Sequence, residues 1–377
     1  MDFDLSREHE LLRKAVREFA EQKITPKVLE LDEKGPFPYD IVRQMGEMGL
    51  IGIVNSKQYG GTAMGHLARM IIVEELSRVY PSLGFFFQAG NLLMYALESF
   101  GNEEQKNKYL PELCKGMKVS GFAVTEQSGG SDPSAMMTIA IPDVDGWVIN
   151  GRKTLITNAE VSHFLGFIAK TGDSYSVFLV EKGTPGYEVT RRESRPGLRS
   201  IPVNELAFTN CRIPKGNLVG QEGRGMGVAI TTISVIGRIA AAAVALGAAQ
   251  GAYEEALKFS KERILYGKPI SNLQAIQFML VDMQTDIEAA RWLVYRPAWL
   301  LDQGKSPRDA GVEIARAKLI AVDMAIRNCL KAQQIMGAYG QSPEYRVEMY
   351  LRDVLELLSA GGTQEIMRAT IGRAITA

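Results

Sequence analysis

A short glycine-containing segment has the composition of a ligand-binding loop. Residues 122–124 are apolar, and the segment 125–132 that follows reads Thr-Glu-Gln-Ser-Gly-Gly-Ser-Asp. Gly129 and Gly130 permit backbone shapes and close approaches that other residues forbid, so the amides of this loop can face an anionic or planar ligand. A Gly-Gly turn is also common without any ligand. The segment therefore predicts a binding loop only if other residues support it.

A single charge in an apolar segment is the second candidate. Arg238 lies among Ile236, Ile239 and several alanines. An idle charge is costly in such surroundings, so Arg238 is either a paired or snorkelling structural residue or a residue that faces a ligand. The residues alone leave both interpretations open.

The composition is that of a soluble globular protein. Of 377 residues, 46% are apolar and 23% are charged, and 43 basic residues balance 43 acidic ones. This balance argues against nucleic acid or an anionic membrane as the main partner. The cysteines and histidines are scattered, so we expect no metal site and a reducing, cytoplasmic setting. The start of the chain does not resemble a signal peptide, and the apolar segment 228–249 is expected to be a buried helix rather than a membrane span.

The elements that position these residues follow the order α, β, α. Pro38 and Pro81 mark expected helix starts, and Asn150-Gly151 predicts a two-residue hairpin turn. Helical spacing covers residues 5–115, including a helix over 92–100, and returns over 228–263, 273–303, 306–339 and 344–358. Strands are predicted over 164–169, 175–180 and 205–208. The expected fold is α+β, with an N-terminal helical domain (1–118), a central β-barrel-like domain (119–220) and a C-terminal four-helix bundle (221–377).

Five blocks of the sequence together resemble the flavin-dependent acyl-CoA dehydrogenase family. Segment 125–132 resembles the family's T-E-P-x-A-G-S-D loop, and 151–158, Gly-Arg-Lys-Thr-Leu-Ile-Thr-Asn, resembles its G-x-K-x-W-I-T-N segment. Residues 263–267 followed by Gln274 resemble R-x-x-F-G followed by a glutamine. Segments 334–337 and 362–366 match the last two blocks. The resemblance runs in order over nearly the whole chain and implies the acyl-CoA dehydrogenase fold.

The resemblance implies a tightly bound FAD. The main chain from Phe122 to Ser131 would meet the flavin, and Leu155 to Thr157 would cover its ring. Leu155 and Gln127 replace the family's usual tryptophan and proline. The family completes each FAD site with a second subunit, which Arg263 would reach, although Arg263 could instead be a solvated helix-end charge. The cofactor-binding residues implied are Phe122, Val124, Thr125, Gly130, Ser131, Leu155, Ile156, Thr157, Arg263, Leu265, Tyr266, Leu273, Gln274, Gln334, Gly337, Ala338, Gly362, Thr363 and Glu365.

The family's usual proton acceptor is missing. Family members remove a proton from Cα of the thioester with a glutamate, which usually stands just before Gly-Thr in the last block. That position is Gly361 here, and the position that some branches use instead, immediately before the helix arginine, is Gly237. Glycine accepts no proton, so α,β-dehydrogenation with either usual base is not expected.

A branch of the family suggests where the base has moved. The cyclohex-1-ene-1-carboxyl-CoA dehydrogenases of anaerobic aromatic metabolism also lack both glutamates and need an acid on the acyl-pocket helix. Asn91, near the expected start of that helix, is isosteric with aspartate but cannot accept a proton. Our hypothesis is that position 91 is the relocated base site carrying an inactive or engineered amide; the alternative is that Asn91 caps the helix. Substrate-binding residues expected by the resemblance are Tyr95, Ser131, Val235 and Arg238.

Four interpretations of the function remain. The first is conversion of a cyclic enoyl-CoA to a conjugated diene. The others are a conventional short or branched acyl-CoA dehydrogenase with an unidentified base, and a catalytically silent acyl-CoA-binding homologue; a flavin monooxygenase-like relative is a further possibility. The expected partners are an acyl-CoA, an electron-transfer flavoprotein or similar acceptor, and further copies of the chain in a homotetramer.

Overall fold

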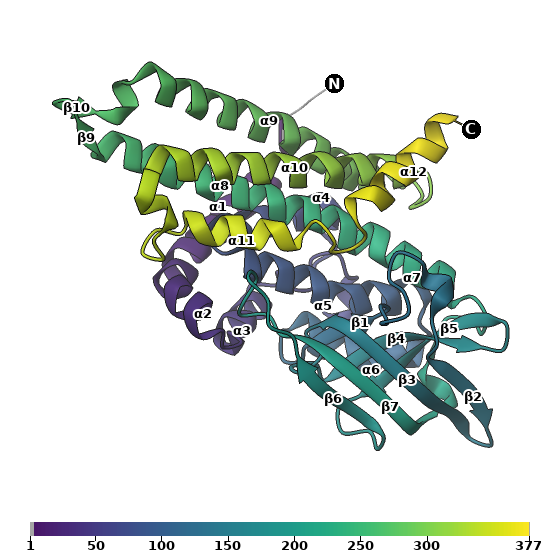
Figure 1. Ribbon diagram of the computed structural model, residues 1–377. Helices are drawn as coiled ribbons and strands as arrows, with labels where there is room; N and C mark the ends of the chain where they lie inside the picture. Colours follow the sequence, from purple (N-terminus) through teal and green to yellow (C-terminus); the bar gives the residue numbers. More distant parts are fainter. Residues whose placement is uncertain (1–3, 377) are drawn as a thin grey trace.

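A helical group opens the chain, as the apolar spacing predicted. The computed structural model describes residues 4–376, and Figure 1 shows two helical groups and one β domain. The first helices are α1 (Arg7–Phe19), α2 (Val28–Lys34), α3 (Tyr39–Glu47), α4 (Gly65–Val79), α5 (Pro81–Phe100) and α6 (Glu103–Cys114).

Helix α5 begins at Pro81, as the proline predicted, and not at residue 92. Tyr80 is extended, and Pro81 occupies the first helical position, where a missing amide costs nothing. Gly101 ends the helix, and Asn102 caps α6 with its side chain. Asn91 therefore lies in the middle of α5, and the interpretation of Asn91 as a helix cap is wrong.

The β domain is one twisted sheet with mostly antiparallel pairs. Its strands are β1 (Ser120–Ala123), β2 (Ile139–Asp143), β3 (Gly146–Thr157), β4 (Phe164–Thr171), β5 (Ser174–Glu181), β6 (Tyr187–Arg192), β7 (Val203–Pro214) and β8 (Leu218–Val219). The strand order is β6-β7-β3-β2-β4-β5-β8, and β1 pairs in parallel with β4. Phe167 stacks on Phe178 and on Phe208 in the hydrophobic core of the β domain.

The hairpin predicted at Asn150-Gly151 is wrong, because β3 runs straight through this pair. The turn lies instead between Asp143 and Gly146. Opposite β7 the register shifts between Ile149 and Gly151, which marks a β-bulge. Gly151 is needed there, since a Cβ would lie 2.5 Å from the hydroxyl oxygen of Thr138. Pairing with β2 and β7 thus overrides the local turn preference.

Helices return after β8 and continue to the end. They are α7 (Gly225–Thr232), the π-helical segment η6 (Ile233–Arg238), α8 (Ile239–Glu262), α9 (Gln274–Asp302), α10 (Gly311–Met336), α11 (Val347–Glu356) and α12 (Gln364–Thr376). A small hairpin of β9 (Ile264–Leu265) and β10 (Lys268–Pro269) joins α8 to α9. The π-helical segment and α12 were not predicted. Figure 1 shows α8, α9 and α10 side by side, with α5 between this layer and the sheet.

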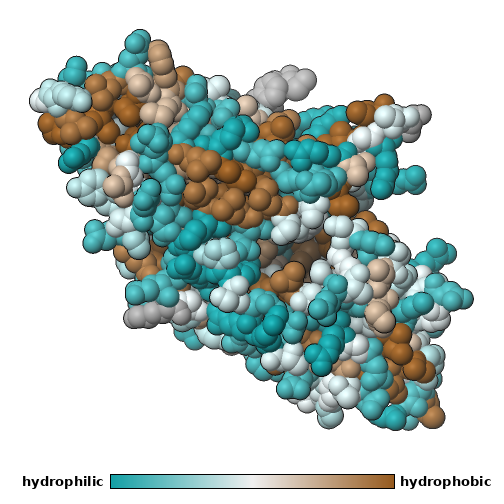
Figure 2. Space-filling view, in the orientation of Figure 1, coloured by the Kyte–Doolittle hydropathy of each residue, from teal (hydrophilic) through white to brown (hydrophobic). Residues whose placement is uncertain are grey.

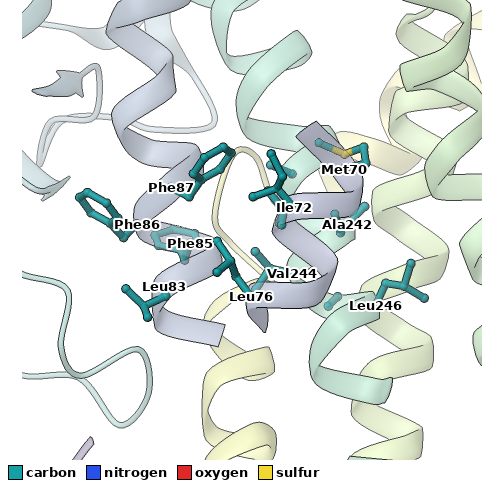
Figure 3. Close-up of a cluster of buried hydrophobic side chains, with 14 of the residues drawn as sticks. Met70, Ile72, Leu76, Leu83, Phe85, Phe86, Phe87, Ala242, Val244 and Leu246 are labelled. Atoms are coloured by element: carbon teal, nitrogen blue, oxygen red, sulfur yellow. The ribbon is translucent and has the colours of Figure 1, made fainter. Parts of the chain in front are cut away.

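Helix α8 is rich in alanine because it packs closely on α4. A Cβ at Gly247 would lie 2.3 Å from the Glu74 carbonyl oxygen, and one at Gly251 would lie 2.2 Å from that of Arg78. Figure 3 shows larger side chains of α4 and α5, among them Ile72, Phe85 and Phe87, filling the space beside α8. The helical residues from Gly225 to Glu262 are long and apolar enough to cross a membrane, but 78% of their most apolar window is buried. This is what a core helix requires.

Candidate active site

The predicted binding loop is held from behind by a buried ion pair. The ammonium of Lys153 on β3 donates to the Glu126 carboxylate at 2.7 Å and to the Val124 carbonyl at 3.2 Å. Glu126 also accepts from the amides of Met137 and Thr138. Burial opposes ionisation of Glu126, but Lys153 and these donors hold its pKa below its ordinary value. Burial lowers the pKa of Lys153 to about 8 against the attraction of Glu126.

The front of the loop presents unused donors. Within residues 4–376, the amides of Thr125, Gly130 and Ser131 donate no hydrogen bond to the chain. A Cβ at Gly129 would lie 2.5 Å from the Asp132 carbonyl oxygen, so glycine is required to close the turn. Free amides on a tight, rigidly backed loop are what a flavin edge or a pyrophosphate needs. The loop thus fits FAD chemically.

The neighbouring part of β3 is shaped by a second irregularity. Leu155 has a φ of +57° in a register shift between Lys153 and Ile156, and 57% of its surface is exposed. Leucine rarely adopts this conformation, which costs about 1–2 kcal/mol. The bulge turns an apolar side chain outward beside half-buried Thr157. An apolar surface of this kind fits one face of a planar ring.

The two empty base positions lie against each other. A Cβ at Gly361 would lie 3.4 Å from the carbonyl carbon of Gly237. A Cβ at Gly237 would point elsewhere. It would lie 3.7 Å from Cγ2 of Ile233, 3.8 Å from Cδ2 of Leu92 and 3.9 Å from the side-chain oxygen of Gln88. Neither position supplies an acid, and both leave ordinary van der Waals room for a side chain.

Arg238 connects these two positions. Its Nε donates to the Gly361 carbonyl at 3.1 Å and Nη1 to the Ser234 hydroxyl at 3.4 Å. Among the ion pairs of the described residues Arg238 has no carboxylate partner, and burial lowers its pKa. Arg238 is therefore not a structural arginine paired with an acid. It is a half-buried cation at the loop that lacks the usual glutamate.

A second cation, Lys318 of α10, holds the next residue of this loop. Its ammonium is buried and donates to the Gly362 carbonyl. Burial and the charge of Arg238 lower the pKa of Lys318 to about 7. Gly361 and Gly362 have φ angles of +69° and +114°, which glycine adopts at little cost and other residues adopt only with strain. Thr363 follows at the start of α12, where its hydroxyl accepts from the Ile366 amide.

Asn91 is buried but borders a different space. Its Nδ2 donates to the Phe87 carbonyl at 2.8 Å, and its Oδ1 has no partner. It lines a cavity of about 20 Å³ with Ser120 and Lys118. That volume holds about one water molecule. Leu92, the next residue, faces Gly237, whereas Asn91 faces the cavity that residues of α3, α6 and β1 help to line.

The remaining residues predicted to bind substrate lie on the helices and on the binding loop of the β domain. Tyr95 is half-buried on α5, with its ring 6.3 Å from that of His66, and burial raises its pKa. Val235 is fully buried in η6, whereas Ser131 is exposed at the binding loop. Figure 2 shows a hollow, apolar at its base, between the helical layer and the β domain.

A second group of predicted residues lies at the far end of the C-terminal helices, away from the binding loop (Figure 1). Arg263 stacks 5.6 Å above the ring of Tyr339, and both line a cavity of about 270 Å³. The structure brings Arg263 to Tyr339, directly after the segment 334–338, but not to Thr125. The exposed members of this group are Arg263, Leu265, Tyr266, Gln274, Gln334, Gly337 and Ala338, with Leu273 half-buried.

Several residues at the site were missed from the sequence. Lys153 and Glu126 lie inside quoted motifs, and a lysine beside a strand's apolar residues was a signal of burial. Gln88 is 5% exposed with an unpartnered side-chain oxygen near Gly237. Lys318 lies among apolar helix residues, as Arg238 does, and this was a signal of a buried cation. No group of three or more metal-ligating side chains occurs in the part of the chain that the structure describes.

Comparison with known proteins identifies the family. Three family profiles match: "Acyl-CoA dehydrogenase, N-terminal domain" over residues 6–117, "middle domain" over 121–211 and "C-terminal domain" over 223–376. A short-chain-specific acyl-CoA dehydrogenase of Clostridium acetobutylicum is 40% identical, with 98% of each chain covered. The cyclohex-1-ene-1-carbonyl-CoA dehydrogenase of Syntrophus aciditrophicus is 37% identical, covering 99% of this chain and 91% of its own. The solved butyryl-CoA dehydrogenase of Megasphaera elsdenii is 34% identical over all of both chains, with a TM-score of 0.96.

The fold and the matches agree on a class of enzyme, the FAD-dependent oxidoreductases that act on CH–CH groups. The chain belongs to the acyl-CoA dehydrogenase family. The expected fold, cofactor and reaction class on CoA thioesters are confirmed. The relatives include linear-chain and cyclic-substrate enzymes at similar identity, so they do not single out the acyl group.

Proposed function

We propose that the active site is built for a cyclic enoyl-CoA thioester, such as cyclohex-1-ene-1-carboxyl-CoA, and for its conversion to a conjugated diene. The observation that supports this proposal is the contact between Gly237 and Gly361, two base positions without an acid. A Cβ at Gly237 would make ordinary van der Waals contacts with Ile233, Leu92 and Gln88, so the space beside Gly237 has room that a glutamate side chain would fill. A ring is the bulky group that such room suits.

The proposed reaction is a 1,4-elimination across the existing double bond. The C3–H bond of the ring breaks and its proton goes to a base, since C3 is acidified through conjugation with the thioester. The C6–H bond breaks as hydride, the C1=C2 bond becomes single, and C2=C3 and C1=C6 double bonds form. FAD held by the 125–131 loop and covered by Leu155 and Thr157 would supply the hydride acceptor. No base at Cα is required, which agrees with the two glycines.

Position 91 is the proposed base site, and its amide leaves the chain without a proton acceptor there. Asn91 is 1% exposed, and its Nδ2 donates to the Phe87 carbonyl. An aspartate could make this hydrogen bond only when protonated. Burial and the lost donor would therefore raise its pKa toward neutrality, which suits a general base.

The test is anaerobic mixing of the FAD-containing protein with cyclohex-1-ene-1-carboxyl-CoA, followed by flavin absorbance. Asn91→Asp should increase the rate of flavin bleaching at least about 100-fold, the contribution of a general base. Asn328→Asp is a matched control, because Asn328 is also buried, donates to a helix carbonyl (Met283) and has an unpartnered Oδ1. No gain in folded Asn91→Asp, or an equal gain in Asn328→Asp, would overturn the assignment of position 91.

A second experiment tests the vacant position in the last block. Gly361→Glu has room for its Cβ, and its φ of +69° costs about 1–2 kcal/mol. With a saturated cyclohexane-carboxyl-CoA, folded Gly361→Glu should show α,β-dehydrogenation that the parent lacks. Dehydrogenation already present in the parent would favour a conventional enzyme with an unidentified base. Ester binding without bleaching in every variant would favour a silent acyl-CoA-binding homologue, and oxygen consumption with weak ester affinity would favour a monooxygenase-like relative.

We also infer how the cofactor is held. Thr125, Gly130 and Ser131 would face the flavin and pyrophosphate, while Leu155 and Thr157 would cover the ring. The predicted residues near Arg263 lie at the far end of the C-terminal helices, away from the binding loop, which supports their contact with the FAD of a second subunit. A homotetramer, a cytoplasmic location, an electron-transfer flavoprotein as acceptor, and domain limits at 118 and 220 remain parts of this proposal.

A further inference from the structure

Arg69 of α4 is a fully buried cation that no described carboxylate approaches within ion-pair distance, although the charge of Asp302 acts on it from further away. It is 0% exposed, and no ion pair of the described residues includes it. Burial lowers its pKa to about 9, so it still carries its charge at neutral pH. Its nearest side-chain partner is His66, whose Nδ1 lies 3.5 Å from Nη2. Burial and this neighbouring charge lower the pKa of His66 to about 3, so His66 is neutral and its Nδ1 accepts the hydrogen bond.

The charge of Arg69 is directed at main-chain carbonyls. Nη2 donates to the Val235 carbonyl at 2.7 Å and Nη1 to the Ile236 carbonyl at 3.1 Å. Both carbonyls belong to η6, the π-helical segment that interrupts the long helix. A π-helical turn widens the helix and disturbs its regular hydrogen-bond ladder. A cation that binds two successive carbonyls stabilises this widened turn by charge-assisted hydrogen bonds.

The two residues that follow these carbonyls form part of the active site. Gly237 directs its open Cβ position to α5, and Arg238 donates to the Gly361 carbonyl. The Gly361 Cβ position also lies 3.4 Å from Gly237. A regular α-helical turn would rotate residues 237 and 238 relative to α5 and to the loop before α12. The π-helical turn therefore fixes both the direction of Gly237 toward α5 and the hydrogen bond from Arg238 to the Gly361 carbonyl.

We propose that Arg69 is a positioning residue for the acyl-CoA site, which keeps η6 in its π-helical turn so that Gly237 and Arg238 face the substrate. Arg69 is buried behind η6, and the inference assigns it no contact with the thioester. It applies to any acyl group bound here and does not depend on the cyclic substrate. Failure of Asn91→Asp would therefore leave it untouched.

The test measures ester affinity separately from folding. Arg69→Met and Arg69→Lys are prepared as FAD-containing proteins, and dissociation constants for butyryl-CoA and cyclohex-1-ene-1-carboxyl-CoA are measured from the flavin absorbance change. Arg69→Met should weaken both esters at least tenfold at an unchanged ratio of FAD to protein. Arg69→Lys retains a cation that can bind a carbonyl, and it should lie within about threefold of the parent.

Arg78 supplies the matched control. It lies on the same helix, is 7% exposed, and pairs with Glu75, Glu254 and Glu21 rather than with η6. Arg78→Met should lower the melting temperature and leave the ester dissociation constants within twofold. The proposal is overturned if Arg69→Met binds the esters like the parent, or if Arg78→Met weakens the esters as much as Arg69→Met. If Arg69→Met yields no folded protein, Arg69→Gln, which keeps one amide donor, replaces it, with an expected loss of at least threefold and the same refuting result.

Discussion

Replacing Lys153 by methionine tests whether the buried ion pair holds the flavin loop. Lys153 is 1% exposed, and its ammonium is the only cation that pairs with Glu126 among the described ion pairs. The substitution keeps much of the apolar volume but leaves the Glu126 carboxylate buried with two amide donors. Breaking a buried pair in this way costs about 3–5 kcal/mol.

Protonation of Glu126 limits this cost, because a neutral carboxyl group is less costly to bury than a charged one. The ordinary pKa of Glu126 is 4.5, which is 2.5 pH units below pH 7. At 1.36 kcal/mol each, protonation costs about 3.4 kcal/mol. At pH 7 we therefore expect a loss of about 3 kcal/mol, or roughly 5 °C in melting temperature for a chain of this size. Because the loop is released, the FAD content should fall as well.

The pH dependence has a definite sign. In the parent the pKa of Glu126 is lowered, so its stabilisation is present above the ordinary value of 4.5 and is lost as the pH falls. In Lys153→Met that pKa is raised, so the stabilisation is present at low pH and is lost as the pH rises. The gap in melting temperature between parent and variant should therefore widen from pH 5 to pH 8.

The assay is thermal unfolding by circular dichroism and by release of flavin fluorescence at pH 5, 6.5 and 8. Adding Glu126→Gln to Lys153→Met removes the buried charge and should restore most of the loss and flatten its pH dependence. Lys108→Met removes an exposed pair with Glu181 and should cost no more than about 1 kcal/mol. A constant gap across pH, or a gap that narrows toward pH 8, would refute the reasoning.

Two further perturbations follow from the same site. Gly129→Ala places a Cβ 2.5 Å from the Asp132 carbonyl oxygen, so it should destabilise the fold by about 1–3 kcal/mol and lower the FAD content. The control Gly216→Ala meets no atom within 4 Å and should change neither quantity. Equal FAD contents in the two variants would contradict this prediction. Burial and Arg238 lower the pKa of Lys318 from 10.5 to about 7, so the unfolded chain binds the extra proton between these values and stability due to this group rises with pH. Lys318→Met should remove that rise, and an unchanged difference in melting temperature between pH 7 and pH 9 would count against it.

The residue types of the candidate site were easier to see in the sequence than the elements that carry them. The amides of the 125–131 loop, the pair Gly237–Gly361 and the charge of Arg238 all depend on residue types, which are visible in the sequence. Asn150-Gly151 misled because local turn preference was weaker than pairing with β2 and β7 on both sides. The start of α5 was misplaced because its apolar residues leave little helical periodicity, and Pro81 was the better signal.

Two features had no local signal at all. The π-helical turn of η6 depends on Arg69, which is 166 residues away from Val235 in sequence. Lys153, the partner of Glu126, lies 27 residues away on β3. Such long-range partners of main-chain atoms and buried charges cannot be read from periodicity. They require the tertiary packing to be known.

The positions available to a base differ in the direction from which they approach the acyl group. A side chain at 361 would come from the loop before α12 and lie against η6, whereas one at 237 would point from η6 toward α5. Position 91 lies on α5 itself, next to Leu92, which faces Gly237. The hydride acceptor is proposed to stay beside β3 and the 125–131 loop in each case. Moving the base from position 361, in the loop before α12, to position 91 on α5 would therefore change which carbon can lose its proton. The hydride acceptor would stay the same. A conjugated ring offers an acidic C3 to a base that approaches from this new direction.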